Sequence, residues 1–188
     1  ALADLHCSTK GNVGGGIMAP RTSPNRSGKK LAMTVNYVRW LRSYVGHQRI
    51  LQLSASAFIT DSRGHVLLGQ RADVMLWAPP SGVVQLGETP AKTLVREVQE
   101  ETGLYVEVER LIGLYTGRDF EWTYPNGDQA QIVTAFFACR VVGGVLTPDY
   151  SEFVSLRYYP PDHLPPLMPR CVRMLQDALR GRTEAAFD

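Results

Sequence analysis

The stretch GVVQLGETPAKTLVREVQEETGL, residues 82–104, constrains the fold more tightly than any other part of the chain. Thr89 followed by Pro90 is typical of a helix start, because threonine accepts a free backbone N–H and proline suits the first helical position. Gly103 is typical of a helix end, where the chain often turns left-handed. Apolar residues recur at helical spacing between these signals, at Ala91, Leu94, Val95 and Val98. We therefore predict an amphipathic helix between Thr89 and Gly103.

Three glutamates of this predicted helix, Glu97, Glu100 and Glu101, fall within one sector of about 100° beside the apolar stripe. Carboxylates on adjacent turns repel one another unless cations lie between them. Hard oxygen ligands grouped in this way suit Mg²⁺ or Mn²⁺. The alternative is a solvated acidic face, which is the commonest fate of glutamates on a helix. Arg96 offsets charge from the flank, and Glu88 precedes the helix N-terminus, where the helix dipole favours an anion.

The same stretch resembles the Nudix hydrolase signature, G-x5-E-x7-R-E-U-x-E-E-x-G-U, in which U is a bulky aliphatic residue. Its fixed positions all match without a gap: Gly82, Glu88, Arg96, Glu97, Val98, Glu100, Glu101, Gly103 and Leu104. Looser resemblance extends over most of residues 50–165. The resemblance implies an α/β fold of the Nudix type, an α/β/α sandwich with a mixed β-sheet and a loop-helix-loop catalytic box.

The resemblance also implies an activity, the metal-dependent hydrolysis of a nucleoside diphosphate linked to another group X. The products are a nucleoside monophosphate and phosphorylated X. Glu97, Glu100 and Glu101 are then the ligands of Mg²⁺ or Mn²⁺, and Arg96 orients the first of them. A backbone carbonyl ahead of the box glycine joins them, and in this chain it belongs to Ser81.

Two further points concern the box and its surroundings. Gly82, Glu88 and Gly103 are expected to have structural roles in the box. The family usually has Leu-Pro-Gly-Gly where this chain has residues 79–82, PPSG, and serine resists a positive φ more than glycine does. The general base is left open between Glu152, just before the last predicted strand, and the box glutamates Glu100 and Glu101.

Substrate contacts are predicted in the segment 117–129, GRDFEWTYPNGDQ, which contains an Asn126-Gly127 turn signal. Its aromatic residues can stack on a base and its arginine can hold a phosphate, as can an arginine at the end of an earlier strand. These candidates are Phe120, Trp122, Tyr124, Arg118 and Arg71. The alternative is a hairpin whose aromatic side chains pack on the edge of a sheet.

The rest of the chain predicts helices and strands that do not alternate strictly, which favours a mixed sheet. Helical spacing over residues 34–46 predicts an added N-terminal helix with Thr34 as its cap, and Gly46 ends it. Strands are expected at 51–59, 65–71, 105–117, 131–142 and 153–160, with a turn at 61–64. A last helix is predicted from Pro169 to Leu179, with Val172, Leu175 and Leu179 directed inward.

Composition limits the class of protein. A chain of 188 residues with 44% hydrophobic and 20% charged residues is typical of a soluble globular protein. No apolar run approaches the ~20 residues of a membrane span. The net charge of +2 is too small to favour nucleic acid or membrane as a partner. Three cysteines, Cys7, Cys139 and Cys171, without a CxxC motif argue against a disulfide framework or zinc site and favour the reducing cytoplasm.

Residues 1–32 differ from the remainder. They are rich in Gly, Ser, Pro and Asn and carry a net charge of +4, whereas residues 33–188 carry −2. Such a segment buries too little apolar area to offset the entropy of ordering it. We predict a disordered basic tail, either native or added for expression, ahead of a single domain over residues 33–188.

Two functional classes are consistent with the sequence. The first is a hydrolase acting on a small nucleotide substrate, an ADP-ribose-like compound or nucleotide sugar before a (d)NTP. The second is a nucleotide-sensing Nudix module without turnover. The intact box favours the enzyme. The N-terminal helix, with Tyr37, Trp40 and Tyr44, is expected either to form a homodimer contact or to cover the sheet.

Removal of residues 1–32 should leave catalysis intact, because they contain no part of the box and no periodic apolar stripe. We expect kcat/KM of the chain starting at Met33 to stay within about twofold, and Tm within a few degrees, since no core area is lost. A rise in KM for a highly anionic substrate should fade at high salt, where screening shortens the reach of the basic cluster. Loss of activity or unfolding on truncation would make the tail part of the fold.

Overall fold

The computed structural model describes residues 36–187, so the predicted tail at 1–32 and the Thr34 cap lie outside the described residues. Its helices are α1 (Tyr37–Val45), α2 (Pro90–Thr102) and α3 (Pro169–Leu179), with a short 3₁₀ helix, η1 (Arg118–Phe120). Its strands are β1 (Ile50–Ile59), β2 (Val66–Arg71), β3 (Trp77–Ala78), β4 (Ser81–Val83), β5 (Leu104–Tyr115), β6 (Glu121–Thr123), β7 (Gln129–Gly144), β8 (Phe153–Tyr159) and β9 (Ala186–Phe187). No helix in this part of the chain has the length and apolar character needed to span a membrane.

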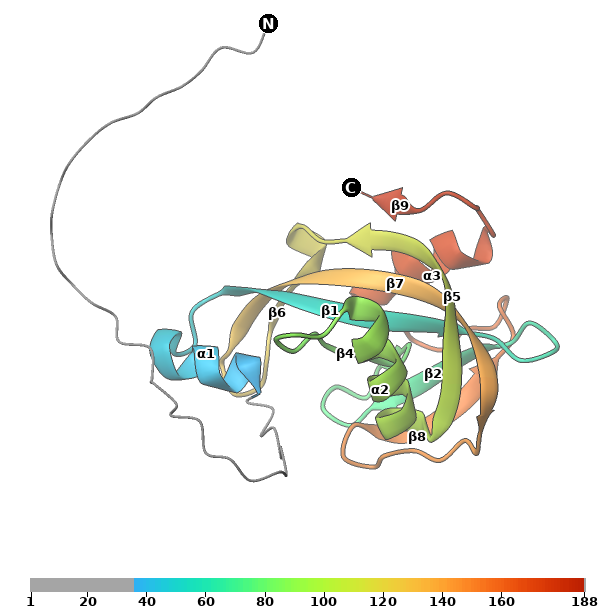
Figure 1. Ribbon diagram of the computed structural model, residues 1–188, viewed down its shortest axis with the longest axis horizontal. Coiled ribbons are helices and arrows are strands. Elements are labelled where there is room, and N and C mark those ends of the chain that lie inside the picture. Colours follow the sequence, from blue (N-terminus) through green and yellow to red (C-terminus); the bar gives the residue numbers. More distant parts are fainter. Residues whose placement is uncertain (1–35, 188) are drawn as a thin grey trace, which may run out of the picture. The chain divides into compact units, whose positions relative to one another are not determined.

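The strands form two sheets (Figure 1). In the larger sheet the order is β4-β1-β7-β5-β9, and β6 also pairs with β7. β1 and β7 run parallel, with Ser54 opposite Thr134, whereas β5 and β7 are antiparallel. The smaller sheet is antiparallel and has the order β3-β2-β8. The predicted mixed sheet is therefore confirmed.

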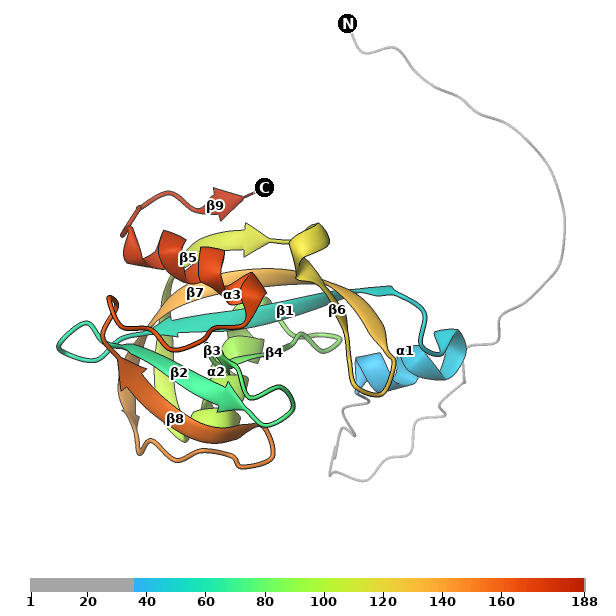
Figure 2. The ribbon, with the colours of Figure 1, turned by 180° about the vertical axis from the view of Figure 1, so that it is seen from behind.

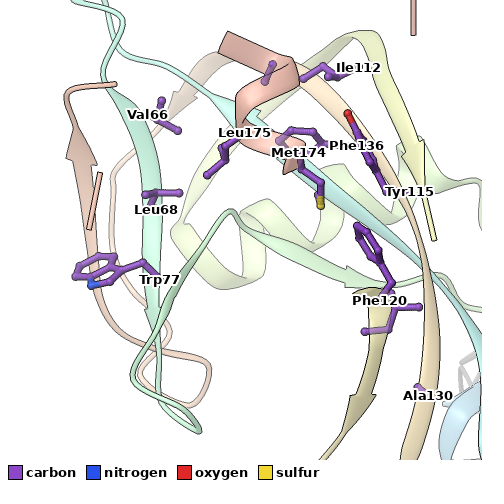
Figure 3. Close-up of a cluster of buried hydrophobic side chains, with 12 residues drawn as sticks. Val66, Leu68, Trp77, Ile112, Tyr115, Phe120, Ala130, Phe136, Met174 and Leu175 are labelled. Atoms are coloured by element: carbon purple, nitrogen blue, oxygen red, sulfur yellow. The ribbon is translucent and has the colours of Figure 1, made fainter. Parts of the chain in front are cut away.

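Helices α2 and α3 cover opposite faces of the larger sheet, as the two opposed views show (Figures 1 and 2). On one face, Leu94 and Val98 of α2 pack with Ala55 and Ala57 of β1. On the other face, α3 contributes to a cluster with residues of β2, β5 and β7 (Figure 3). Its members include Val66, Leu68, Ile112, Tyr115, Phe136, Met174 and Leu175. This is the predicted α/β/α sandwich.

The predicted helix Pro169–Leu179 has the observed bounds of α3, but its inward face was partly wrong. Val172 and Leu179 are 40% and 39% exposed, whereas Leu175 is buried. The buried residues are Cys171, Met174, Leu175 and Ala178, which form the i, i+3, i+4, i+7 stripe. A similar difference occurs in α2, where Leu94 and Val98 are buried as predicted but Val95 is exposed. In α3 the sulfur-containing side chains, which fill irregular core gaps well, take the inward positions.

Strand β1 alternates as predicted, but its polar positions are the buried ones in the first half. Gln52 and Ser54 are 6% and 9% exposed, whereas Leu51 and Leu53 are 68% and 41% exposed. β1 lies between β4 and β7 within the sheet, and the clusters that contain α2 and α3 cover its two faces over much of its length. Side chains of alternating residues point to opposite faces. The polar set therefore lies on the α3 side of the sheet, together with Thr134 of β7.

The predicted role of Cys139 as a small buried hydrophobe is confirmed. Cys139 and Cys171 are free and buried, and burial raises the pKa of their thiols to about 12 and about 11. Both are consequently protonated and unreactive at neutral pH. Cys7 lies outside the described residues.

Two leucines of α3 test the observed helix face. Leu175→Ala should lower the free energy of unfolding by about 2–5 kcal/mol, because it leaves a cavity in the core. Leu179→Ala, the same change at a position 39% exposed, should cost less than about 1 kcal/mol. Urea denaturation of the two variants beside the wild type gives both values. Equal losses would contradict the observed rotation of α3.

Candidate active site

Helix α2 has the bounds and caps that its sequence predicts. The Thr89 hydroxyl accepts a hydrogen bond from the backbone N–H of Lys92 at 3.3 Å, and Pro90 begins the helix. Gly103 ends it with a φ of 71°, and its N–H donates to the Gln99 carbonyl at 2.9 Å. The buried Leu94 and Val98 fix the rotation of α2 on the sheet. That rotation decides where the carboxylates of the helix point.

Arg96 joins the glutamates of the box. Its Nε and Nη2 donate to the two carboxylate oxygens of Glu88 at 2.9 and 3.0 Å. Its Nη1 donates to Glu97 at 2.8 Å and to Glu100 at 3.0 Å. Glu88 also accepts hydrogen bonds from the Thr93 hydroxyl and the Gln85 N–H, and the Arg96 contact chiefly lowers its pKa to about 2. Glu88 is thus a permanent anion that ties the loop before α2 to the helix.

Glu97 and Glu101 lie in a different environment from Glu88. Glu101 is 5% exposed and accepts a hydrogen bond from the Ser81 N–H at 3.0 Å. Burial raises its pKa well above the ordinary value, and the charges of Glu97 and Glu152 raise it further. Burial also raises the pKa of Glu97, against the effect of Arg96 and with that of Glu100 and Glu152. Glu152 thus lies close enough to Glu97 and Glu101 for its charge to act on both.

Gly82 allows α2 to approach strand β4 closely. A Cβ at this position would lie 2.0 Å from Cδ of Glu97, so any larger residue displaces that side chain. The requirement is one of space, because Gly82 does not have a positive φ. Ser81 does not have one either, since Met75 is the one non-glycine residue with a positive φ within residues 36–187. The serine that departs from the usual family sequence therefore causes no backbone strain.

A cavity of about 350 Å³ lies beside these carboxylates. Glu97, Glu101 and Glu152 line it together with two cationic side chains, Arg71 and Arg170. Its other walls include Tyr124, Ile132, Met174 and the polar residues Gln52, Ser54, Ser56 and Thr134. Negative, positive, aromatic and hydroxyl groups thus meet in one space, a composition suited to a polar ligand that carries both anionic and ring-shaped parts.

The two arginines are held by neighbours. Arg71 donates from Nε and Nη2 to the two carboxylate oxygens of Asp73 at 2.9 and 2.8 Å. The Arg170 guanidinium lies over the ring of Trp122, 5.4 Å from its centroid. These contacts orient the guanidinium groups at the cavity wall, where they can meet phosphate oxygens.

Within residues 36–187 the acidic side chains do not form a preformed cluster of three or more metal ligands. Arg96 holds Glu97 and Glu100, and the Ser81 N–H holds Glu101. The carboxylates of Glu97, Glu101 and Glu152 line the same cavity. Glu100 is exposed and does not line it.

A sequence profile of the NUDIX domain matches residues 50–177. The chain belongs to the NUDIX family. The resemblance drawn from the box is confirmed, and so is the expected class of enzyme, a hydrolase of phosphoanhydride bonds. The match includes all of α2 and ends within α3, but helix α1 lies outside it.

Other NUDIX proteins resemble the chain over most of the domain. A MutT-like protein of Streptomyces ambofaciens is 34% identical over 69% of this chain and 77% of its own length. An NAD-capped RNA hydrolase NudC of Vibrio vulnificus is 33% identical over 56% of this chain, which spans only 37% of that protein. The crystal structure of an ADP-ribose pyrophosphatase of Streptococcus suis superposes with a TM-score of 0.58 at 27% identity, over 74% of this chain and 100% of that one.

The predicted substrate residues separate into two groups. Arg71 and Tyr124 line the cavity. Arg118 is exposed on η1 away from the cavity lining, and Phe120 is 5% exposed and stacked on Tyr115 in the core. Trp122 packs against core residues and reaches the site only through Arg170. The predicted Asn126-Gly127 turn is confirmed, with a φ of 88° at Gly127. The alternative prediction, in which aromatic side chains of this hairpin pack on the sheet, holds for Phe120.

Several lining residues were not predicted from the sequence. Arg170 could have been noticed in the sequence, because a cation in the first turn of a helix is disfavoured by the helix dipole and therefore suggests another role. Gln52, Ser54 and Ser56 had none, because alternating polar residues in a strand ordinarily indicate a solvent-facing side.

Glu101→Gln keeps the shape of the side chain and removes a charge that burial disfavours. Because the pKa of Glu101 is raised from 4.5, the folded state binds more protons than the unfolded state above that pH. The wild type therefore loses stability as pH rises through this window, and the variant does not. With EDTA present, we expect the variant to have the larger free energy of unfolding at about pH 7, and no advantage below about pH 4. If the variant were less stable than the wild type at about pH 7, the prediction that the buried charge of Glu101 destabilises the fold would be wrong.

Proposed function

We propose that this NUDIX protein hydrolyses the pyrophosphate bond of a nucleoside diphosphate linked to another group, with Mg²⁺ or Mn²⁺ as cofactor. The products are a nucleoside monophosphate and a phosphorylated second product. The observation that carries the proposal is the shared cavity, which joins the box carboxylates Glu97 and Glu101 to Glu152, Arg71 and Arg170. Acidic and cationic groups on one cavity suit a substrate whose anionic phosphates are bound through both metal ions and guanidinium groups.

The donor set fits a hard divalent cation. Burial raises the pKa values of Glu97 and Glu101, and neighbouring carboxylates, Glu152 among them, raise them further, so a cation beside these two side chains relieves repulsion that the protein otherwise bears. Glu100 and the Ser81 carbonyl are the further ligands that we propose. A bound divalent cation neutralises phosphate oxygens and acidifies a water molecule.

The side chains of the protein have distinct proposed roles. Arg96 and Glu88 hold the orientation of Glu97 through the contacts described above. Arg71 and Arg170 bind and orient the phosphate oxygens, which keeps the leaving group in line with the attacking water. Glu152 accepts the proton of that water, because it combines a position on the cavity wall with access from solvent. Glu101, more deeply buried, serves as a ligand.

An ADP-ribose-like compound or a nucleotide sugar is the first substrate class that we propose, and a (d)NTP the second. Two relatives bear names that concern ADP-ribose and NAD-capped RNA, and both compounds contain an ADP moiety. The cavity supports a ligand with parts on either side of its phosphates, because it extends from the carboxylates to Tyr124 and Gln52.

A nucleotide-sensing module without turnover is the other function that we weigh. The observation against it is the retained geometry of Glu97, Glu101 and Arg96, since loss of catalysis removes the need for buried, destabilising carboxylates. A sensor binds nucleotide without releasing products, so turnover separates the two functions.

The test is a panel of ADP-ribose, nucleotide sugars, NADH and (d)NTPs with Mg²⁺, scored by product mass. We expect a nucleoside monophosphate as one product of the preferred substrate and complete loss of turnover in excess EDTA. Glu97→Gln should lower kcat at least ~100-fold, because charge stabilisation at the metal site contributes several kcal/mol.

Glu109→Gln is the matched control, since Glu109 is an exposed glutamate of β5 paired with Arg140. It should leave kcat within about twofold. Full activity in EDTA, or a folded Glu97→Gln protein with wild-type turnover, would refute the mechanism. Nucleotide binding without any product would favour the sensor.

A further inference from the structure

Gln52 is a buried amide with unused hydrogen-bonding capacity on the cavity. The side chain lies on β1 and is 6% exposed. Its Nε2 donates one hydrogen bond to the Tyr124 hydroxyl at 3.2 Å, and within residues 36–187 its Oε1 has no partner. A second N–H of the amide is also without a partner in this part of the chain. Because Gln52 lines the cavity, these unpartnered groups are available to a ligand there.

The neighbouring polar groups are already committed to the protein. The hydroxyls of Ser54 and Thr134 lie 3.3 Å apart, and the Ser56 hydroxyl donates to the Pro80 carbonyl. The Gln85 amide accepts from the Tyr37 N–H at 2.8 Å and donates to the Val83 carbonyl. Gln52 therefore differs from the other polar residues of the cavity in offering a donor and an acceptor side by side.

The space beside Gln52 suits a flat ring. Tyr124 supplies an aromatic face, and Ile132 and Met174 supply apolar contacts in the same cavity. A second hollow of about 390 Å³ shares Asn36, Gln52, Gln85 and Tyr124 with it and continues toward helix α1. The cavity beside Gln52 therefore offers an aromatic face and apolar contacts, and the adjoining hollow adds the charged residues Arg39, Arg42 and Asp128.

Helix α1 is fixed at this end of the cavity, although it lies outside the region matched by the NUDIX profile. Its first N–H group, that of Tyr37, donates to Gln85 at 2.8 Å. Arg42 donates from Nη2 to the Gln129 carbonyl at 2.7 Å and lies 3.5 Å from the Asp128 carboxylate. Helix α1 is thus attached to both the box loop and strand β7, and its Val38, Arg39 and Arg42 line the second hollow.

We propose that Gln52 recognises the nucleobase of the substrate, and that this base is adenine. The inference rests on the proposed function, which places the phosphates at the carboxylate end. The free N–H and Oε1 of one amide pair with adenine through N7 and the N6 amino group, the pairing that glutamine makes with adenine in nucleic acids. Guanine presents two acceptors, O6 and N7, along the equivalent edge, and the amide satisfies only one of them. The Tyr124 ring stacks on the base while its hydroxyl orients the amide.

The test measures product binding, which needs no turnover. Calorimetric titrations in Mg²⁺ buffer compare AMP, GMP, CMP, UMP and ribose 5-phosphate, which has the phosphate and sugar but no base. Gln52→Leu removes both hydrogen-bonding groups, and Gln52→Glu keeps the shape but removes the donor. Gln176→Leu, the same change at an exposed position of α3, is the matched control.

We expect AMP to bind most tightly of the monophosphates. Each Gln52 variant should weaken AMP about 10- to 100-fold, the discrimination of a good bidentate pair, and leave ribose 5-phosphate within about twofold. Gln176→Leu should change neither. Gln52→Glu, which conserves volume, supplies the result if Gln52→Leu fails to fold.

Three results would overturn the inference. They are tighter binding of another base, unchanged AMP affinity in a folded Gln52 variant, and equal weakening of ribose 5-phosphate. Failure of the proposed hydrolysis is separately visible. If the wild-type protein binds AMP through Gln52 but forms no product from the substrate panel, the proposed base site stands and the proposed hydrolysis fails.

Discussion

The contact between Glu97 and the backbone at Gly82 is the constraint on which the site depends. The side chain of Glu97 occupies the volume that a Cβ at residue 82 would need, so α2 lies directly against strand β4. The same approach brings Glu101 within hydrogen-bonding distance of the Ser81 N–H and buries it. The carboxylates consequently face a cavity rather than bulk water. A helix displaced outward by one methyl group would return them to solvent and relax their raised pKa values.

The charges of the box divide into two kinds because their surroundings differ. Glu88 is fully compensated by the fork of Arg96, which lowers its pKa, and it stabilises the loop that leads into α2. Glu97 and Glu101 are incompletely compensated, and their pKa values rise. One arginine thus separates a structural glutamate from two that are kept in an unfavourable state. Local instability of this kind is typical of active sites, where the same groups become favourable when ligands bind.

The cavity also joins parts of the chain that are far apart in sequence. The end that we propose to bind phosphate draws Arg71 from β2, Glu152 from the turn before β8 and Arg170 from α3. Its other end draws Gln52 from β1 and Tyr124 from the β6–β7 turn, with α1 beside them. Helix α1 lines the hollow that adjoins this end through Val38, Arg39 and Arg42. An element that lies outside the domain common to a family can change which substrate is bound without changing the carboxylates of the site.

The sequence by itself determined those features whose causes are local. The caps Thr89 and Gly103 and the stripe containing Leu94 and Val98 specify helix α2, and the box spacing specifies the family. Tertiary structure decided how β1 is buried, because α2 and α3 pack on its two faces and the parallel pairing with β7 brings Ser54 to Thr134 from 80 residues away. It likewise placed Phe120 in the core and Arg170 at the cavity. Periodicity shows that a strand has two faces, but only the elements packed against each face decide which one receives a substrate.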